Sequence, residues 1–314
     1  DNISLNPTFA FMLTMPEVKG ENAGPCPACG HKEWKFAGEV TDYSISGETF
    51  QLWECPFCHL KATHPRPAES EIGRYYASDD YISHSDTRKG LINSLYHSAR
   101  TYMLKRKHHW ITQVTGRHQG ALLDIGAGTG HFAHFMKEKG WQVTALEPDE
   151  KARKIALAKL QLQVDPLEAL ADQPAQAFDL ITLWHVLEHV YDPDAYLITF
   201  RNLLKPGGTL LIAVPNHTSQ DAAKYGSYWA AYDVPRHLWH FSPEAMDSLM
   251  SRHGFTLQKK IPMHLDAFYV SMLSEKYQGH LSLTTVRGGL IGLRTLWASL
   301  RRADKASSII YVAQ

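Results

Sequence analysis

The sequence predicts an α/β fold with a seven-stranded, mostly parallel sheet, preceded by a small cysteine-bearing module. From residue 119 onward, short apolar runs alternate with helical patterns, which is typical of repeated strand–helix–strand units. One of these runs, residues 121–125, leads into the glycine-rich turn 126–130. All four cysteines lie within the first 58 residues, apart from this pattern.

The 314 residues are enough for one large domain or two smaller ones. We divide them into a cysteine-bearing module (1–67), a helical linker or lid (68–118) and an α/β domain (119–314) with an insertion at about 263–306. Strands are expected near 121–125, 142–146, 162–165, 178–183, 208–214, 255–261 and 308–313. Helices are expected near 131–139, 150–159, 192–204 and 242–253.

The charge balance excludes two classes of protein. Lys+Arg (32) equals Asp+Glu (32), unlike a disordered acidic protein or a polycation that coats nucleic acid. No apolar run approaches the length of a bilayer span, and no basic segment followed by an apolar one marks a secretory leader. We therefore expect a cytoplasmic protein.

The cysteines form two C-x-x-C turns, Cys26–Cys29 and Cys55–Cys58, with 25 residues between them. Two such turns supply the four thiolates of a tetrahedral zinc site, and alternating residues from 34 to 53 suit an antiparallel ribbon. Disulfides and a thioredoxin-type redox pair are the alternatives. We predict a structural Zn²⁺ on all four cysteines. Residues 1–70 hold 5 Lys/Arg against 9 Asp/Glu, so this module is not expected to bind nucleic acid.

The glycine turn has the pattern G-x-G-x-G after an aspartate, Asp124-Ile-Gly126-Ala-Gly128-Thr-Gly130. A dinucleotide fingerprint would need glycine at 131, where this chain has histidine. Acids follow the next two expected strands, and an aromatic residue and a histidine follow the fourth. These residues are Glu147, Asp165, Trp184 and His185.

In this order the motifs resemble those of class I S-adenosylmethionine-dependent methyltransferases, over about residues 119–262. The resemblance implies a Rossmann-like fold and S-adenosyl-L-methionine as cofactor. It places the methionyl group on Asp124, Gly126, Gly128 and Gly130. It also implies that Glu147 binds the ribose hydroxyls, that Asp165 contacts the adenine amine, and that Trp184 and His185 line the cofactor pocket.

Residues 186–193, 214–216 and 235–242 are similar to a subgroup with ubiquinone-pathway O-methyltransferases and zinc-module sugar C-methyltransferases. The resemblance implies methyl transfer to a small-molecule acceptor, either a sugar or a hydroxylated biosynthetic intermediate. Arg236 stands where the sugar enzymes have glutamate, which weakens the sugar assignment. A zinc-module ribosomal RNA methyltransferase and a non-catalytic cofactor-binding scaffold are the alternatives.

His237 is the candidate general base, because an imidazole titrates near neutral pH and this segment covers the substrate side in the family. The alternative is that His237 caps the helix that starts near Ser242 or packs on Trp239; His240 fits either role. Tyr81 is a further candidate for the acceptor pocket. The family's E-x-x-E-H metal motif is H-x-x-E-H here, in His185, Glu188 and His189; we favour a structural role for it over a second metal.

In the insertion, Arg287, Arg294 and Arg301 recur every seven residues beside an apolar stripe within 279–305. Residues 259–305 hold 8 basic and 3 acidic side chains. A basic amphipathic helix of this kind can contact an anionic membrane or a phosphorylated substrate. We favour a lid or dimer helix with solvated arginines; the oligomeric state is open.

Overall fold

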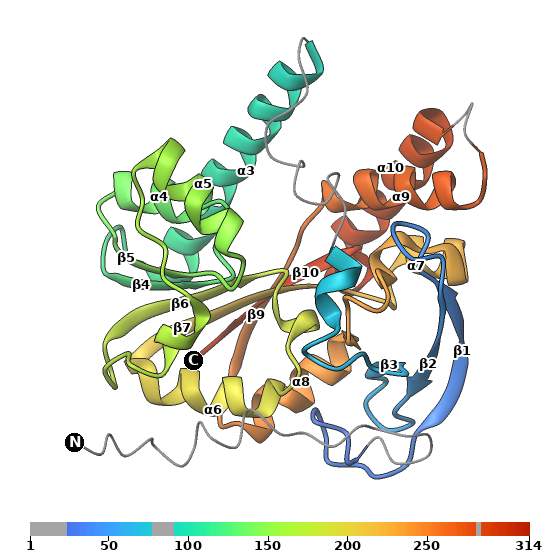
Figure 1. Ribbon diagram of the computed structural model, residues 1–314, viewed down its shortest axis with the longest axis horizontal. Helices are drawn as coiled ribbons and strands as arrows, with labels where there is room; N and C mark the ends of the chain where they lie inside the picture. Colours follow the sequence, from blue (N-terminus) through green and yellow to red (C-terminus); the bar gives the residue numbers. More distant parts are fainter. Residues whose placement is uncertain (1–23, 77–90, 281–283) are drawn as a thin grey trace. The chain divides into compact units, whose positions relative to one another are not determined.

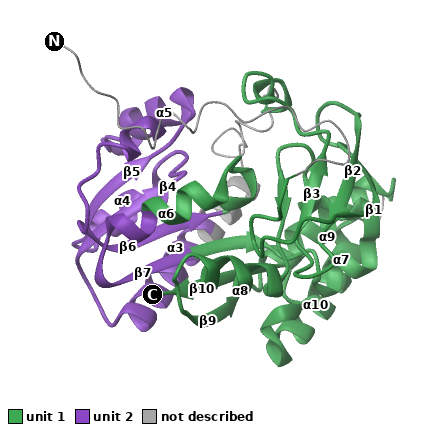
Figure 2. Cartoon of the chain, turned by 90° about the horizontal axis from the view of Figure 1, so that it is seen from below, with its two compact units in different colours: residues 1–76, 185–199, 212–313 green, residues 77–184, 200–211, 314 purple. Residues whose placement is uncertain are grey.

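The computed structural model describes residues 24–76, 91–280 and 284–314. The chain forms two compact units, coloured differently in Figure 2. The glycine-loop unit comprises residues 77–184, 200–211 and Gln314. The ribbon unit comprises residues 1–76, 185–199 and 212–313.

The larger sheet has the order β5-β4-β6-β7-β10-β9. In the glycine-loop unit, β4 pairs in parallel with β5 and with β6, whereas β9 and β10 of the ribbon unit pair antiparallel. The mostly parallel α/β fold is therefore confirmed. The strands are β4 (Ala121–Ile125), β5 (Gln142–Leu146), β6 (Phe178–Trp184), β7 (Leu204–Pro215), β9 (Leu257–Pro262) and β10 (Ser308–Ala313).

Within the described residues this sheet has six strands rather than the expected seven. Residues 162–165 contribute only one parallel bridge, between Leu146 and Asp165. Pro166 follows immediately and has no N–H to continue a ladder. Pairing therefore does not continue beyond Asp165, and Leu162 and Val164 before it pack into a buried cluster instead of forming a strand.

The helices near residues 131, 150, 193 and 243 begin within a residue or two of their expected positions. Three have side-chain caps: Asp149 accepts from the Lys151 N–H, Asp192 from the Ala195 N–H, and Ser242 from the Ala245 N–H. The α-helices are α3 (Leu91–Thr115), α4 (His131–Glu138), α5 (Glu150–Leu160), α6 (Pro193–Leu203), α7 (Gln220–Tyr225), α8 (Pro243–Arg252), α9 (Asp266–Tyr277) and α10 (Thr284–Arg301). Single 3₁₀ turns cover Ile72–Tyr76, Leu167–Leu170, Leu187–His189, Gly226–Tyr228, Ala230–Tyr232 and Ala303–Lys305.

The second sheet, in the ribbon unit, joins segments that lie far apart in the sequence. β1 (Lys35–Thr41), β2 (Thr49–Glu54) and β3 (Lys61–His64) form the antiparallel ribbon, and β8 (Trp239–His240) pairs with β3. Phe50 and Leu52 of the ribbon share a buried cluster with Tyr75, Trp229 and Tyr232. The cysteine-bearing segment thus packs as part of the ribbon unit rather than as a body of its own.

The insertion forms two helices, α9 and α10, seen in orange and red in Figure 1. They approach closely at two glycines. A Cβ on Gly288 would lie 2.6 Å from the backbone of Met272, and one on Gly292 would lie 2.7 Å from the Phe268 ring. Among the described helices, none combines the length and the apolar character that a membrane span requires.

Candidate functional site

Gly128 and Gly130 have different tasks in the turn between β4 and α4, although both have positive φ, +54° and +78°. A Cβ on Gly130 would lie 2.9 Å from Leu162 and 3.0 Å from Ala156, so this glycine lets the turn pack on the core. A Cβ on Gly128 would meet nothing within 4 Å. Gly128 therefore leaves a side of the loop on which a ligand can approach the backbone.

The two acids predicted for the cofactor meet beside this turn. Glu147 accepts the Gly128 N–H at 2.7 Å and the Asp149 N–H at 3.0 Å. Its backbone N–H donates to the Asp165 carbonyl at 2.9 Å, and the Asp165 carboxylate accepts from Gln163. Burial raises the pKa of Glu147. Two carboxylates thus lie at the end of β5, where hydroxyl and amine donors can be bound.

Asp124 and Trp184 lie at the ends of β4 and β6. Asp124 is buried and accepts a 2.7 Å hydrogen bond from Thr182, and burial raises its pKa to about 7. The Trp184 indole lies under the Lys107 ammonium at 3.9 Å, and its Nε1 has no acceptor among the described residues. Sequence reasoning missed Lys107, because one lysine in a basic helix has no local pattern that marks it.

The residues of the glycine-loop unit fit the cofactor that the resemblance implies. Gly128 leaves space, two carboxylates offer acceptors, and the buried Trp184 N–H needs a partner. These are requirements that a ligand with ribose, amine and carboxylate groups can satisfy.

Gly128→Ala is expected to weaken S-adenosylmethionine binding at least tenfold, about 1.4 kcal/mol. The new methyl group would occupy the open side of the loop without touching the core. Gly116→Ala is the matched control, because Gly116 has a similar φ of +64° and equally open surroundings, outside the loop. Calorimetric titration of both variants with S-adenosylmethionine checks this. If Gly128→Ala bound the cofactor as tightly as Gly116→Ala, the cofactor would not bind at the glycine loop.

His185 is the first residue of the chain after β6 and adopts φ +59°, which is rare outside glycine. Its ring lies between two carboxylates of the ribbon unit: Nδ1 is 3.5 Å from Glu188 and Nε2 is 3.3 Å from Asp266. Burial alone would lower the pKa of His185, but these two charges outweigh it and raise the pKa to about 9. The side chain is therefore an imidazolium at neutral pH. Asp266 had no sequence signal, since it lies in the insertion.

His237 is buried and has one ring nitrogen fixed. Nδ1 lies 2.9 Å from the Ala231 carbonyl oxygen, which can only accept, so Nδ1 carries the proton. Nε2 is then the free acceptor, 4.0 Å from Glu188 and 3.9 Å from Asp233. Burial, together with the neighbouring His189, lowers the pKa of His237 to about 4. The ring is neutral at pH 7.

Glu188 provides the test for a second metal. It is 1% exposed, and neither carboxylate oxygen has a hydrogen-bond partner among the described residues. Ligand atoms of Glu188, His189 and His237 lie within 4.8 Å of one another, whereas His185 forms ion pairs with both Asp266 and Glu188. A buried carboxylate that has an ion pair but no hydrogen bond, beside two further histidines, fits a divalent cation, with His237 in the place that the motif gave to His185.

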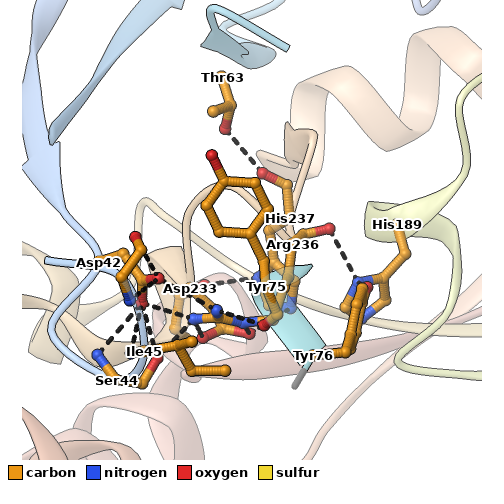
Figure 3. A network of polar contacts seen from close by, with 12 residues as sticks. Asp42, Ser44, Ile45, Thr63, Tyr75, Tyr76, His189, Asp233, Arg236 and His237 are labelled. Carbon is orange, nitrogen blue, oxygen red and sulfur yellow. Dashed lines mark hydrogen bonds and ion pairs between the residues drawn. The ribbon is translucent and has the colours of Figure 1, made fainter. Parts of the chain in front are cut away.

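Arg236 holds the His237 segment in place (Figure 3). It is 1% exposed and forms ion pairs with Asp42 at 2.9 Å and with Asp233 at 2.6 Å, and it donates to the Tyr75 carbonyl. Burial alone would raise the pKa of Asp42, but the hydrogen bonds and charge of Arg236 hold it well below its usual range. The positive charge of the guanidinium is therefore neutralised by Asp42 and Asp233, two acids of the ribbon unit.

Thr63 of the ribbon makes two further contacts with this segment. Its hydroxyl donates to the His237 carbonyl at 2.7 Å and lies 3.0 Å from His240 Nε2. His240 is buried against the ribbon, and burial lowers its pKa well below the usual value.

Tyr81, the further candidate for the acceptor pocket, lies outside the described residues.

The four cysteine side chains converge as predicted. Their sulfurs lie within 4.8 Å of one another, with Cys26–Cys58 and Cys29–Cys55 each at 3.5 Å, and all four are free thiols. The sulfur–sulfur edge of a tetrahedral zinc–thiolate site is about 3.8 Å. Both turns close with the same hydrogen bond, from Gly30 to Cys26 and from His59 to Cys55. The arrangement fits zinc rather than two disulfides.

Comparisons with known proteins place the chain in a family. Residues 96–260, more than half of the chain, match the methyltransferase domain family. The chain is 34% identical over 150 residues to the ubiquinone biosynthesis O-methyltransferase of Caulobacter vibrioides, covering 44% of this chain and 60% of that protein. It is 28% identical over 163 residues to the human mitochondrial ubiquinone biosynthesis O-methyltransferase, covering 47% and 44%. The chain thus spans about half the length of these relatives.

Among solved structures, the chain is similar to 1,6-didemethyltoxoflavin-N1-methyltransferase from Burkholderia thailandensis. The identity is 16%, the TM-score is 0.47, and the alignment covers 88% of this chain and 98% of that one. The family match over residues 96–260 carries the assignment: the chain belongs to the methyltransferase domain family, with the class I fold that its glycine loop predicted.

Proposed function

We propose that this chain transfers the methyl group of S-adenosylmethionine to a hydroxyl group of a small biosynthetic intermediate. Family membership and the fit of the glycine-loop unit support the donor. The names of the relatives, O-methyltransferases of ubiquinone biosynthesis, support an oxygen acceptor. Arg236 does not decide between a sugar and another acceptor, because Asp42 and Asp233 already neutralise it.

One observation carries the acceptor chemistry: the Nε2 atom of His237 is a buried proton acceptor with no proton of its own. When the sulfonium methyl moves to the acceptor oxygen, the hydroxyl proton passes to Nε2 and S-adenosylhomocysteine leaves. Glu188 and Asp233, 4.0 and 3.9 Å from Nε2, stabilise the imidazolium that forms. His237 is therefore our candidate base.

A divalent cation on Glu188, His189 and His237 is the second candidate for this cluster, favoured by the unsatisfied carboxylate of Glu188. When bound, such an ion supplies a Lewis acid for the acceptor oxygen. His237 is then a ligand rather than the base. Dialysis against EDTA followed by readdition of Mn²⁺, which accepts both nitrogen and oxygen ligands, separates the two: unchanged turnover supports the base, and restored turnover supports the cation.

We also propose a structural Zn²⁺ on Cys26, Cys29, Cys55 and Cys58, on the strength of their convergence. Residues 1–70 are acidic, which disfavours the ribosomal RNA alternative. The non-catalytic scaffold is disfavoured by the free Nε2 of His237, because a cofactor carrier has no need for a buried base.

His237→Gln is expected to lower turnover 10²- to 10⁴-fold, the usual effect of losing a positioned base, and to leave cofactor affinity unchanged. A base must be unprotonated, and the pKa of His237 is about 4. Wild-type activity should therefore stay flat from about pH 8 to about pH 5 and fall only at lower pH. Methyl transfer to a metabolite extract at each pH measures this.

His240→Gln is the matched control, because it alters a second buried histidine on the same segment. It should lower thermal stability and leave turnover per folded molecule near wild type. The assignment of His237 as the base would be wrong if wild-type turnover fell with a midpoint near pH 6.5. It would also be wrong if His240→Gln lost more turnover than His237→Gln.

A further inference from the structure

Helix α10 has most of its large apolar side chains facing outward; Ile291 packs against the buried cluster that includes Tyr225 and Val270, and Leu296 is half-buried. The buried residues of this helix are small, namely Gly288, Gly292, Thr295 and Ser299. The apolar side chains at four- and three-residue spacing, which normally face a core, are 44–63% exposed: Val286, Leu290, Leu293, Trp297 and Leu300. Small residues at a helix contact with apolar residues facing outward are typical of helices packed in a lipid environment.

The charges beside this stripe have one sign. Arg287, Arg294 and Arg301 lie along one edge of it, and no acidic residue occurs between Thr284 and Arg301. Arg287 pairs with Glu275 at 3.1 Å. Arg294 and Arg301 have no acidic partner among the described residues. Arg294 also lines a hollow with Lys224 of α7.

These charges decide what covers the stripe. A second copy would fit the apolar spacing, but flanking positions in a helix pair need opposite charges, and this helix offers only arginines. A surface of lipid phosphates satisfies the arginines and the stripe together. Trp297, 59% exposed, is the residue type that favours the headgroup level of a bilayer.

We propose that α10 binds the surface of an anionic phospholipid bilayer, with its apolar stripe in the headgroup–acyl boundary and Arg294 and Arg301 on lipid phosphates. The helix lies on the surface and does not cross it. The proposal is independent of the methyl acceptor. It revises the expectation of a lid or dimer helix with solvated arginines.

Co-sedimentation with vesicles tests this, using phosphatidylcholine alone or mixed equally with phosphatidylglycerol. Wild-type protein should bind the anionic vesicles and lose binding as salt rises. Leu290→Asp combined with Trp297→Asp should abolish binding. Arg294→Gln combined with Arg301→Gln should weaken it about 30-fold, which corresponds to about 1 kcal/mol for each arginine.

Two control proteins match these changes at exposed positions of the glycine-loop unit. Leu157→Asp places a charge at a 55% exposed leucine of α5, and Lys105→Gln with Lys137→Gln removes two exposed positive charges. Both should bind like wild type, and all variants should keep wild-type turnover on water-soluble acceptors. Equal binding to both vesicle types, or binding that survives the aspartates, would overturn the proposal. So would a wild-type dimer that the aspartates dissociate, without any vesicle binding, because a second copy would then cover the stripe.

Discussion

Cys55→Ser is expected to release zinc, unfold the ribbon and reduce turnover at least tenfold, although Cys55 and His237 are far apart in sequence. A structural zinc site contributes about 10–16 kcal/mol in small zinc-finger peptides, so loss of one thiolate removes much of the ribbon's stability. The ribbon holds the segment of the proposed base: Thr63 donates to the His237 carbonyl, β3 pairs with β8, and Ser242 donates to the Cys58 carbonyl. Loss of the ribbon therefore frees the His237 segment.

The measurements are zinc content by mass spectrometry, the unfolding transition, and cofactor affinity. Affinity should stay near wild type, because the glycine loop belongs to the other unit. Phe57→Ser is the control, since Phe57 lies within the same turn but is 73% exposed. A zinc-free Cys55→Ser protein with wild-type stability and turnover would show that the four cysteines have another role.

Asp42→Ala is expected to cost about 3–5 kcal/mol of unfolding free energy, because it leaves a buried guanidinium short of one partner. Asp42 also accepts backbone hydrogen bonds from Ser44 and Ser46, which the variant loses. Because the folded pKa of Asp42 lies below its unfolded value, this stability is present at neutral pH and disappears as the pH falls below the normal aspartate range. Urea unfolding measures the difference.

Glu39→Ala, an exposed acid of β1, should change stability by less than about 0.5 kcal/mol. Asp42→Ala should also cost little when Arg236 is already methionine, because no buried charge then remains to be paired. A loss below about 1 kcal/mol in the wild-type background would mean that water reaches Arg236.

The local patterns predicted the glycine-loop unit well. Its strands and most of its helices, α3 excepted, are marked by local apolar patterns, so the glycine turn and Glu147 could be located at strand ends without tertiary information. The same patterns overestimated residues 162–165, where Leu162 and Val164 are apolar because they pack into a buried cluster and only Asp165 forms a bridge.

The ribbon unit was less predictable, because its site depends on contacts between distant segments. The Asp42–Arg236 pair spans 194 positions, and no local spacing marks either residue as a partner of the other. The position of His185 after the fourth expected strand predicted that it lines the cofactor pocket, but its ring forms an ion pair with Asp266 of the insertion. In α10 the spacing of the arginines and apolar residues predicted a helix, but only the structure shows that its buried residues are the small ones.

Isotope-labelled S-adenosylmethionine tests most directly whether the protein transfers a methyl group to a small hydroxylated acceptor. The zinc-loaded protein is incubated with labelled cofactor and cell extract, which is then separated into metabolite and nucleic-acid fractions for mass spectrometry. We predict label in a metabolite, on an oxygen atom, and strongly reduced incorporation with His237→Gln. Label confined to RNA, or no incorporation in any fraction while the cofactor binds, would contradict the account.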